Sequence, residues 1–405
     1  MLTLEARSLR EQLLTACHRG PSALRSEVRL LPPAEGTKVF PPTYAPPPGS
    51  QGSPRYAEEP RYIDGEPTPT VLLDSVPSQA NRMEQALLAA CRRGAIRLPL
   101  LQVEIPGHGA VTSLDAPHRV FDAIFRDSLL DGEPFPTSRI GRALREAGLG
   151  NATALFRYAP TALLFGAWDS HTGRGTKGTK IPRAVVSEIV GVAAQRGVRT
   201  QGRIDPLGIE RDVAEIYRTE QADWGFSEED VKKAAARAGR GDVKVKKSRP
   251  SEIGHGNIAP TVQEDAGGVS IRYALHTTVI SVAQLRQLRF PDGTGKTSAD
   301  RDAAGRLVLL SLALYATAAL HEEGYQLRSR CLLIPESEPR WELVGPTAGE
   351  RKSFALDTSG ARALLDEALE IAASHDLNWE TEPVILQPSP KLVRLVELND
   401  ATMGR

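Results

Sequence analysis

The pattern of hydrophobic and polar residues changes its period along the chain, and each period predicts an element. Residues 23–30 alternate between polar and apolar side chains, as in a strand with one buried face. A helix-like segment at residues 3–17 precedes this strand. Apolar residues then recur at helical spacing from Ala80 to Cys91, and Gly94 supplies a stop signal. The chain is therefore expected to begin with a helix, a strand and, farther on, a second helix.

The rest of the chain mixes both periods. Further strands are expected at residues 71–74, 96–103, 161–168, 268–280, 329–335 and 392–398. Further helices are expected at residues 115–128, 138–147, 299–323 and 359–374. Strands and helices do not follow a regular β-α-β rhythm, which favours an α+β fold over a doubly wound parallel sheet.

The most apolar stretch, Leu307 to Leu320, is interrupted by Ser311 and Thr317. It is shorter than the roughly 17–25 residues that cross a bilayer, so a buried helix is expected and a membrane partner is not. Residues 1–20 carry several charges and lack the apolar core of a signal peptide.

The three cysteines do not point to a disulfide framework or a metal site. Cys17, Cys91 and Cys331 lie far apart in the sequence, which supports neither a disulfide framework nor a structural zinc site. A reducing cytoplasm is the expected compartment.

A proline-rich stretch separates the first strand from the second helix. Eleven of the 30 prolines lie between residues 32 and 70. Proline removes backbone donors and blocks helix, so an extended segment or long loop is expected. Two interpretations remain open, a surface loop and an arm that lies on a partner.

Charge is balanced over the whole chain but not along it. The 405 residues include 50 Lys and Arg and 50 Asp and Glu, which excludes a uniformly basic nucleic-acid binder. Residues 171–203, however, carry seven basic residues and one acid, and residues 231–249 carry eight and one. Acids outnumber bases after Pro335. We expect the basic residues to form one positively charged groove.

The glycine-rich segment 173–180 is the best candidate for binding phosphates. Its glycines let a ligand approach the backbone, and Arg174, Lys177 and Lys180 supply positive charge. It departs from a nucleotide-binding loop because Thr179 follows Gly178 where that motif has lysine. The alternatives are a loop that holds a sugar-phosphate backbone and a solvated flexible loop.

No catalytic constellation is visible in the sequence. Asp169, Ser170 and His171 are adjacent, and adjacent residues rarely converge on one reacting atom. A GxSxG motif is absent from the sequence. His118 and His255 are isolated histidines. We expect no catalytic residue, no metal ligand and no cofactor.

Several ordered segments together resemble one family, the backbone subunit of type I-U (also called I-G) CRISPR interference complexes. The matching segments are Leu72–Glu84, Thr112–Arg119, Tyr158–Ser170, Ile181–Gly191, Ser251–Pro260, Leu285–Phe290 and Gly324–Cys331. The resemblance spans roughly residues 28–335, and it rests on the order of several segments. The N-terminal helix and the proline-rich arm depart from the family pattern.

The resemblance implies a member of the RAMP superfamily with a modified RNA-recognition (ferredoxin-like) core and large insertions. The implied layout is an N-terminal helical extension (1–22), a palm (23–335) and an acidic C-terminal α/β segment (336–405). Insertions into the palm are the arm (32–70) and a basic finger or thumb (about 204–266). Such a subunit polymerises along a CRISPR guide RNA and has no catalytic role. Its partners are the guide RNA, target DNA through the guide, copies of itself in a helical array, and other subunits.

A guide must be held regardless of its sequence, which requires contacts to phosphates and 2′-hydroxyls. We expect Arg174, Lys177, Lys180 and Arg183 to line the guide, helped by Arg82, His118 and Arg119, and residues 244–249 to close over it. Including the family segments, the predicted RNA-binding residues are Asn81, Arg82, His118, Arg119, Arg174, Lys177, Lys180, Arg183, Lys244, Lys246, Lys247, Arg249, His255 and Asn257.

Two alternative functions remain. The first is an endoribonuclease of the same superfamily that processes CRISPR RNA with His118 or His255 as general base. The second is an interaction scaffold that binds no RNA. The acidic C-terminal part is either a surface that faces a neighbouring copy or a solvated surface.

Overall fold

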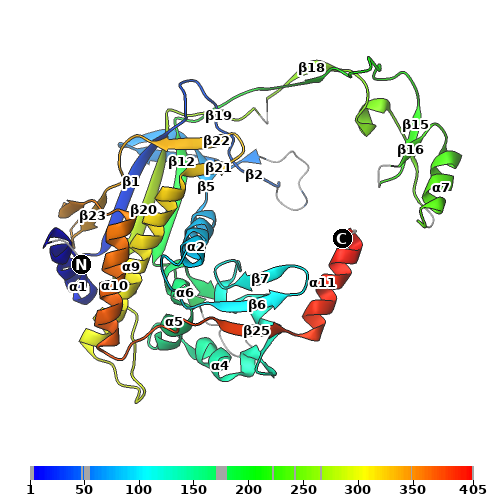
Figure 1. Ribbon diagram of the computed structural model, residues 1–405. Helices are drawn as coiled ribbons and strands as arrows, with labels where there is room; N and C mark the ends of the chain where they lie inside the picture. The colour runs from blue at the N-terminus through cyan, green and yellow to red at the C-terminus, as the bar shows by residue number, and fades with distance from the viewer. Residues whose placement is uncertain are drawn as a thin grey trace. The chain divides into compact units, whose positions relative to one another are not determined.

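The computed structural model describes residues 4–46, 49, 55–169, 180–220, 223–240, 243–264, 267–347 and 349–403. The chain forms two compact units (Figure 1). Unit 1 comprises residues 1–37, 58–193 and 271–405, and unit 2 comprises residues 38–57 and 194–270. The predicted insertion at 204–266 lies within unit 2, which starts earlier because a two-stranded ribbon leads into it.

Within the described residues, unit 1 contains a nine-stranded antiparallel sheet. Its main order is β21-β22-β1-β20-β12-β5-β4, and β23 pairs with both β1 and β24. The strands are β1 (Ala23–Leu31), β4 (Glu58–Ile63), β5 (Glu66–Asp74), β12 (Val185–Val192), β20 (Tyr273–Ser281), β21 (Tyr325–Arg328), β22 (Cys331–Pro335), β23 (Trp341–Val344) and β24 (Arg351–Phe354).

The four central strands have a recognisable connectivity. In space they run β22-β1-β20-β12, and every neighbouring pair is antiparallel. Helix α2 (Val76–Arg92) lies between β1 and β12 in sequence, and α9 (Ala299–Glu323) lies between β20 and β22. This is the strand order of a split β-α-β-β-α-β sheet, extended here by β5 and β4 at one edge. The predicted α+β fold class is confirmed.

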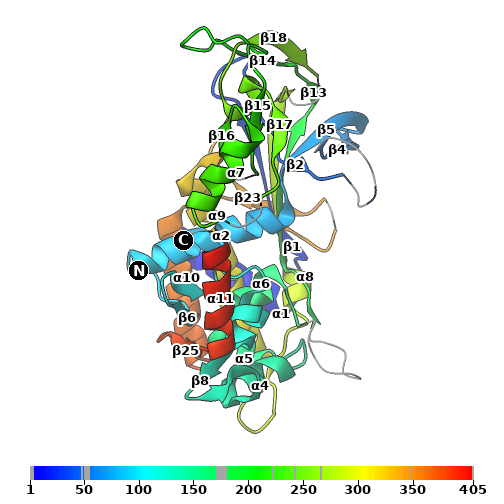
Figure 2. The same cartoon turned by 90° about the vertical axis from the view of Figure 1, so that its right-hand side faces the viewer.

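Helices cover the sheet and build the core of unit 1. Helix α9 contacts α1 (Leu4–His18), α2 and α10 (Thr358–Ala373), and Figure 1 and Figure 2 both show α9 and α10 side by side. The predicted bounds and burial of α9 are confirmed, since its side chains are buried from Arg301 to Leu320. Ser298 caps its first turn and Gly324 follows its last residue. Although α9 is long and apolar enough to span a membrane, its most apolar part is buried inside the protein.

A second sheet in unit 1 has the order β7-β6-β25-β8-β9. Its strands are β6 (Leu101–Ile105), β7 (Gly109–Thr112), β8 (Ser128–Leu130), β9 (Glu133–Pro134) and β25 (Val384–Pro388). Around it lie α3 (Ala123–Arg126), α4 (Arg139–Glu146), α5 (Thr153–Tyr158), α6 (Pro160–Phe165), α11 (Pro390–Met403) and the 3₁₀ helices Arg119–Phe121 and Phe135–Thr137. The remaining elements of unit 1 are α8 (Val282–Leu285) and the β10–β11 pair (Ala167–Trp168 with Lys180–Ile181).

Three sequence predictions are wrong in this region. Residues 161–168 were expected to be one strand, but residues 161–165 belong to helix α6 and the strand is limited to β10 (Ala167–Trp168). A short apolar run buries equally well as a helix. Residues 392–398 belong to helix α11, in which Leu392 and Val396 pack against the core. The single helix expected at 115–128 is instead a 3₁₀ helix followed by the short α3, which starts at the N-cap Asp122.

The proline-rich arm is divided between the two units, and part of it is regular. Residues 58–63 and 66–74 form the β4–β5 hairpin at the edge of the large sheet, so this part of the arm is the extended segment of the two expected alternatives. Pro60 and Pro69 stand opposite one another in this hairpin. Pro60 is tolerated because β4 is an edge strand, and Pro69 because the pairing of β5 with β12 begins only at Thr70.

Unit 2 is built from small antiparallel pairs. They are β2–β3 (Thr43–Tyr44 with Arg55–Tyr56), β13–β19 (Gln195–Arg196 with Val269–Ser270) and β14–β18 (Arg199–Arg203 with Ile258–Gln263). A three-stranded sheet follows, in the order β16 (Trp224–Gly225), β15 (Ile216–Arg218) and β17 (Lys246–Ser248). Helix α7 (Glu228–Arg237) contacts this sheet, and the 3₁₀ helix Pro250–Ile253 follows β17.

Candidate nucleic-acid interface

An arginine pair is fixed on one buried carboxylate where β5 meets α2. Asp74, only 1% exposed, is 2.9 Å from Nε of Arg82 and 3.4 Å from Nη2 of Arg328. Nη2 of Arg82 also donates to the carbonyl of Leu327, and Nη2 of Arg328 donates to that of Leu73. Two cations on one anion leave a net positive charge, and both guanidiniums remain partly exposed.

The chain holds Asp74 firmly in place. Asp74 ends β5, and Ser75 is the N-cap of α2. The Asp74 carboxylate also accepts from Ser78 Oγ at 2.8 Å and from Gln79 Nε2 at 2.6 Å. Asn81, predicted to bind RNA, is exposed one residue before Arg82 on the same helix. Arg328 was not among the predicted site residues, although it lies within one of the family segments.

Arg119 lies inside the protein, which does not fit the prediction that it lines a guide. Its Nε donates to Oε1 of Glu84 at 2.7 Å and its Nη2 to Oε2 at 2.8 Å. Its Nη1 donates to the carbonyl of Gly166 at 2.9 Å. Arg119 is only 5% exposed, and its Nε, Nη1 and Nη2 all donate hydrogen bonds inside the protein. Its role is therefore to stabilise the fold. The adjacent His118 is exposed at the surface.

Arg183 is a half-buried cation of unit 1. Among the described residues none forms an ion pair with it, and its buried Nη1 has no hydrogen-bond partner. Burial, together with the like charge of Arg119, lowers the pKa of Arg183. The residue packs on Gly166, where an added Cβ would lie 2.9 Å from Cγ of Arg183. This glycine therefore makes room for the arginine.

The segment that leads into Arg183 carries the predicted phosphate-binding cations. Lys180 is exposed in β11, opposite Trp168 of β10, which is 60% exposed. Arg174 and Lys177 lie outside the described residues. Of the four cations predicted in this stretch, the structure therefore locates Lys180 and Arg183.

In unit 2, five of the eight basic residues of segment 231–249 form ion pairs, so the charge count of this segment overstates its positive surface. Lys247 pairs with Glu215, Arg249 with Asp212 and Arg240 with Asp223. Lys232 and Lys233 pair with Glu228 and Glu229 one helical turn earlier. Residues 204–230 supply these acids, which the count over 231–249 did not include. Lys244 and Lys246 are exposed, and no described residue forms an ion pair with either.

His255 and Asn257 belong to a loop that is locked by Asp205. The carboxylate of Asp205, 4% exposed, accepts from the backbone N–H of Gly256 at 2.8 Å and of Leu207 at 2.9 Å. These bonds lower the pKa of Asp205. Asn257 accepts from the Asp205 N–H at 2.8 Å, so it organises the loop. His255 is exposed, and its Nδ1 lies 3.9 Å from the Asp205 carboxylate.

One feature that sequence reasoning missed is a row of aromatic and basic side chains in unit 2, here called the aromatic–basic face. Trp224, Arg218 and Lys246 stand directly opposite one another across β16, β15 and β17. Residues opposite in register share a face of the sheet. The rings of Phe226 and His255 contact Trp224 edge-on, with centroids 5.7 Å and 6.3 Å away. Trp224 is 46% and Phe226 69% exposed, a composition typical of surfaces that bind single strands.

The alternation Trp224-Gly225-Phe226 was the available sequence signal, but its meaning depends on strands far apart in the chain. Within the described ranges, no three His, Cys, Asp or Glu side chains gather in a metal-binding group.

The comparisons with known proteins concern mainly unit 1. No curated protein matches the chain. The model of the family described as CRISPR-associated protein GSU0053 matches residues 24–196, which include β1, β5, α2 and β12. Asp74, Arg82, Lys180 and Arg183 all lie in the matched region. The match makes residues 24–196 similar to this family of CRISPR-associated proteins.

Proposed function

We propose that this protein is a non-catalytic, RNA-binding backbone subunit of a type I-U (I-G) CRISPR interference complex in the cytoplasm. It holds the guide RNA through phosphates and 2′-hydroxyls, presents it for pairing with target DNA, and contacts further copies of itself and other subunits. The family match and the β-α-β-β-α-β strand order support this proposal. That strand order is the one expected of an RNA-recognition core.

The observation that carries the proposal is Arg183. A half-buried guanidinium with a buried, unsatisfied Nη1 is costly, and such groups call for an explanation such as an absent anionic ligand. A phosphate oxygen at the exposed part of this half-buried side chain would balance its charge. Exposed Lys180 lies three residues before it, and the Arg82–Arg328 pair presents further positive charge.

The neutralised cations of unit 2 are compatible with this function. Exposed ion pairs contribute only about 0–1 kcal/mol, so phosphates of a polyanion can compete for Lys247 and Arg249.

The salt dependence of RNA binding tests the proposal. For single strands the logarithm of the affinity falls with the logarithm of salt by about 0.7 per phosphate neutralised. We expect the Lys180→Ala/Arg183→Ala variant to bind guide-length RNA more weakly and with a flatter slope. Arg362→Ala is the matched control, because Arg362 is an exposed cation of α10 that pairs with Asp366. An unchanged slope in the double variant would contradict the proposal.

Two further measurements separate the alternatives. Incubation with repeat RNA tests for cleavage, and its loss in His118→Ala or His255→Ala would favour the endoribonuclease. Absence of nucleic acid from the purified protein, together with no binding to added RNA, would favour the scaffold.

A further inference from the structure

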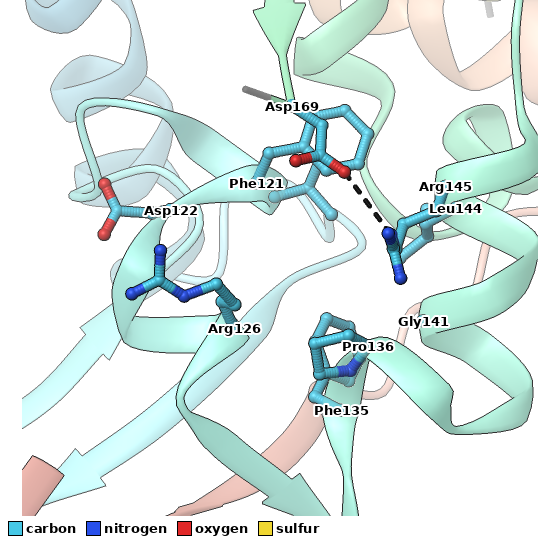
Figure 3. A pocket seen from close by; sticks show the side chains of 10 residues that line it. Phe121, Asp122, Arg126, Phe135, Pro136, Gly141, Leu144, Arg145 and Asp169 are labelled. Atoms are coloured by element: carbon cyan, nitrogen blue, oxygen red, sulfur yellow. Dashed lines mark hydrogen bonds and ion pairs between the residues drawn. The ribbon is translucent and has the colours of Figure 1, made fainter. Parts of the chain in front are cut away.

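Unit 1 contains a cavity of about 250 Å³ near the second sheet (Figure 3). It lies between the 3₁₀ helix Arg119–Phe121, which follows β7, and helix α4. Its lining comes from the 3₁₀ helix Arg119–Phe121, the 3₁₀ helix Phe135–Thr137, α4, and Asp169 at the end of β10. The cavity is smaller than the roughly 300–1,000 Å³ of sites that hold drug-sized ligands. Its size therefore suits a single flat ring system.

Two sides of the cavity are apolar. Figure 3 shows Phe121 and Pro136 on opposite sides of the opening. Phe135 and Leu144 are buried beneath it, with 4% and 1% of their surface exposed. An aromatic ring on one side and a proline on the other form two walls against which a planar ligand can stack.

The other two sides are charged, and the charges balance. Arg145 lies 3.4 Å from Asp169 on one side, and Arg126 and Asp122 lie on the other (Figure 3). Asp122 is committed to the backbone, since it accepts from the N–H groups of Ile124 and His118. Arg126 also donates to Asp127 from Nε at 3.3 Å and from Nη2 at 2.6 Å, so its charge is already balanced. The charges around the cavity therefore favour a neutral ligand over a phosphate or carboxylate. Four charged groups also disfavour a pure hydrocarbon.

From this geometry we infer that the cavity binds one nucleobase of a bound nucleic-acid strand, stacked between Phe121 and Pro136. A base is flat and neutral, and its edges carry both donors and acceptors, which can face Arg145 and Asp169 on one side and Arg126 on the other. The inference rests on the proposed RNA binding and adds a site to it. Apolar walls accept any base, so the site is compatible with a guide of any sequence.

The place of Asp169 in the sequence supports a nucleic-acid ligand. Asp169 lies on the rim, and the chain continues from it directly into the glycine-rich segment with Arg174 and Lys177. An aromatic side chain of a partner protein is the competing occupant, which the experiment distinguishes.

The test is photocrosslinking of the full-length protein to guide-length RNA that carries 4-thiouridine at successive positions, with crosslinks mapped by mass spectrometry. We expect crosslinks to Phe121 or Phe135.

Phe121→Ala and Arg145→Ala should abolish these crosslinks. Phe121→Ala should also lower the RNA affinity about tenfold, which is the loss expected for one stacked base. Phe121→Tyr retains an aromatic wall and should retain the crosslinks. Arg142→Ala is the matched control, because Arg142 is an exposed cation of the same helix that does not line the cavity.

The outcomes are separable. If RNA binds with full affinity but crosslinks only elsewhere, this inference is wrong and the proposed function stands. If no RNA binds, the proposed function itself fails. If the variants bind and crosslink RNA normally but lose assembly with other subunits, the cavity holds a protein side chain and the inference is overturned. Thermal unfolding shows whether each variant is folded. If Phe121→Ala does not fold, the crosslinks of Phe121→Tyr and Arg145→Ala test the inference.

Discussion

Arg119 and Glu84 form a two-pronged ion pair inside unit 1, with N···O distances of 2.7 Å and 2.8 Å. Glu84 comes from α2 and Arg119 from the 3₁₀ helix that follows β7. The pair ties the segment next to the Phe121 cavity to the helix that carries Arg82. Its role is therefore to position this part of unit 1.

Arg119→Ala is expected to destabilise the protein and leave RNA contacts intact. Removing one partner of a buried pair leaves an uncompensated charge, which costs about 3–5 kcal/mol. Urea unfolding measures this loss. The salt slope of RNA binding, measured where the variant is folded, should stay at its original value.

Arg142→Ala serves as the control for charge, since it removes an exposed arginine from unit 1. The double variant Glu84→Gln/Arg119→Gln should recover part of the stability, because no buried charge is left unpaired. A flatter salt slope in Arg119→Ala, with normal stability, would show that Arg119 contacts RNA.

The fold could be predicted where the sequence pattern is long and unambiguous. Helix α9 was predicted at its observed bounds, because its apolar run is too long for a strand and the segment begins after Ser298 and ends before Gly324. Residues 161–168 and 392–398 failed because runs of under ten apolar residues satisfy a strand and a helix equally well. In both places packing against the rest of the protein selects the helix.

The candidate site was less predictable, because ion pairing depends on the fold. Arg119 and Arg183 look alike in sequence, yet one is fully paired and the other has a buried donor without a described partner. The carboxylates that neutralise Lys247 and Arg249 lie more than 30 residues earlier. Counting charge in one window of sequence misses such partners.

Trp224→Ala is expected to weaken binding of single-stranded nucleic acid by the aromatic–basic face. Stacking of one base on an aromatic side chain is worth about 1–3 kcal/mol. Of the four tryptophans, Trp224 and Trp168 are substantially exposed, so quenching of tryptophan fluorescence by an oligonucleotide reports on them. The quenching amplitude should fall in Trp224→Ala.

Val262→Ala is the control, because Val262 is an exposed apolar residue of unit 2 without an aromatic ring. An equal loss of nucleic-acid affinity in Trp224→Ala and Val262→Ala would indicate that the aromatic–basic face contributes only through general apolar contact. Full affinity and full quenching in Trp224→Ala would exclude stacking at this position.

The buried histidines His276 and His321 should make the protein less stable as the pH falls. Desolvation, together with the neighbouring His321, lowers the pKa of His276 to about 3, and desolvation lowers that of His321 to about 4. In the unfolded chain both histidines take up protons near pH 6.5, while in the folded protein they remain neutral until far lower pH. The free energy of unfolding should therefore fall between pH 6.5 and 5, by up to about 1.4 kcal/mol per pH unit for each histidine.

Urea unfolding at several pH values measures this slope. His276→Gln/His321→Gln should flatten it, whereas His118→Gln should not, because His118 is exposed. A slope that is the same in all three proteins would show that other groups determine the acid sensitivity.

Glu215→Gln is expected to strengthen RNA binding if residues 244–249 contact the guide. Lys247 now pairs with Glu215 at 2.5 Å, and a lysine that is already neutralised releases fewer counter-ions when it meets a phosphate. Freeing Lys247 should raise the affinity for RNA at low salt and steepen the salt slope by up to about 0.7.

Lys246→Ala should have the opposite effect, since no described residue pairs with Lys246. Glu264→Gln is the matched control, because it removes one exposed carboxylate of unit 2 outside residues 204–249. If Glu215→Gln and Glu264→Gln shift the slope equally, only the overall charge of unit 2 matters, and residues 244–249 do not contact the strand.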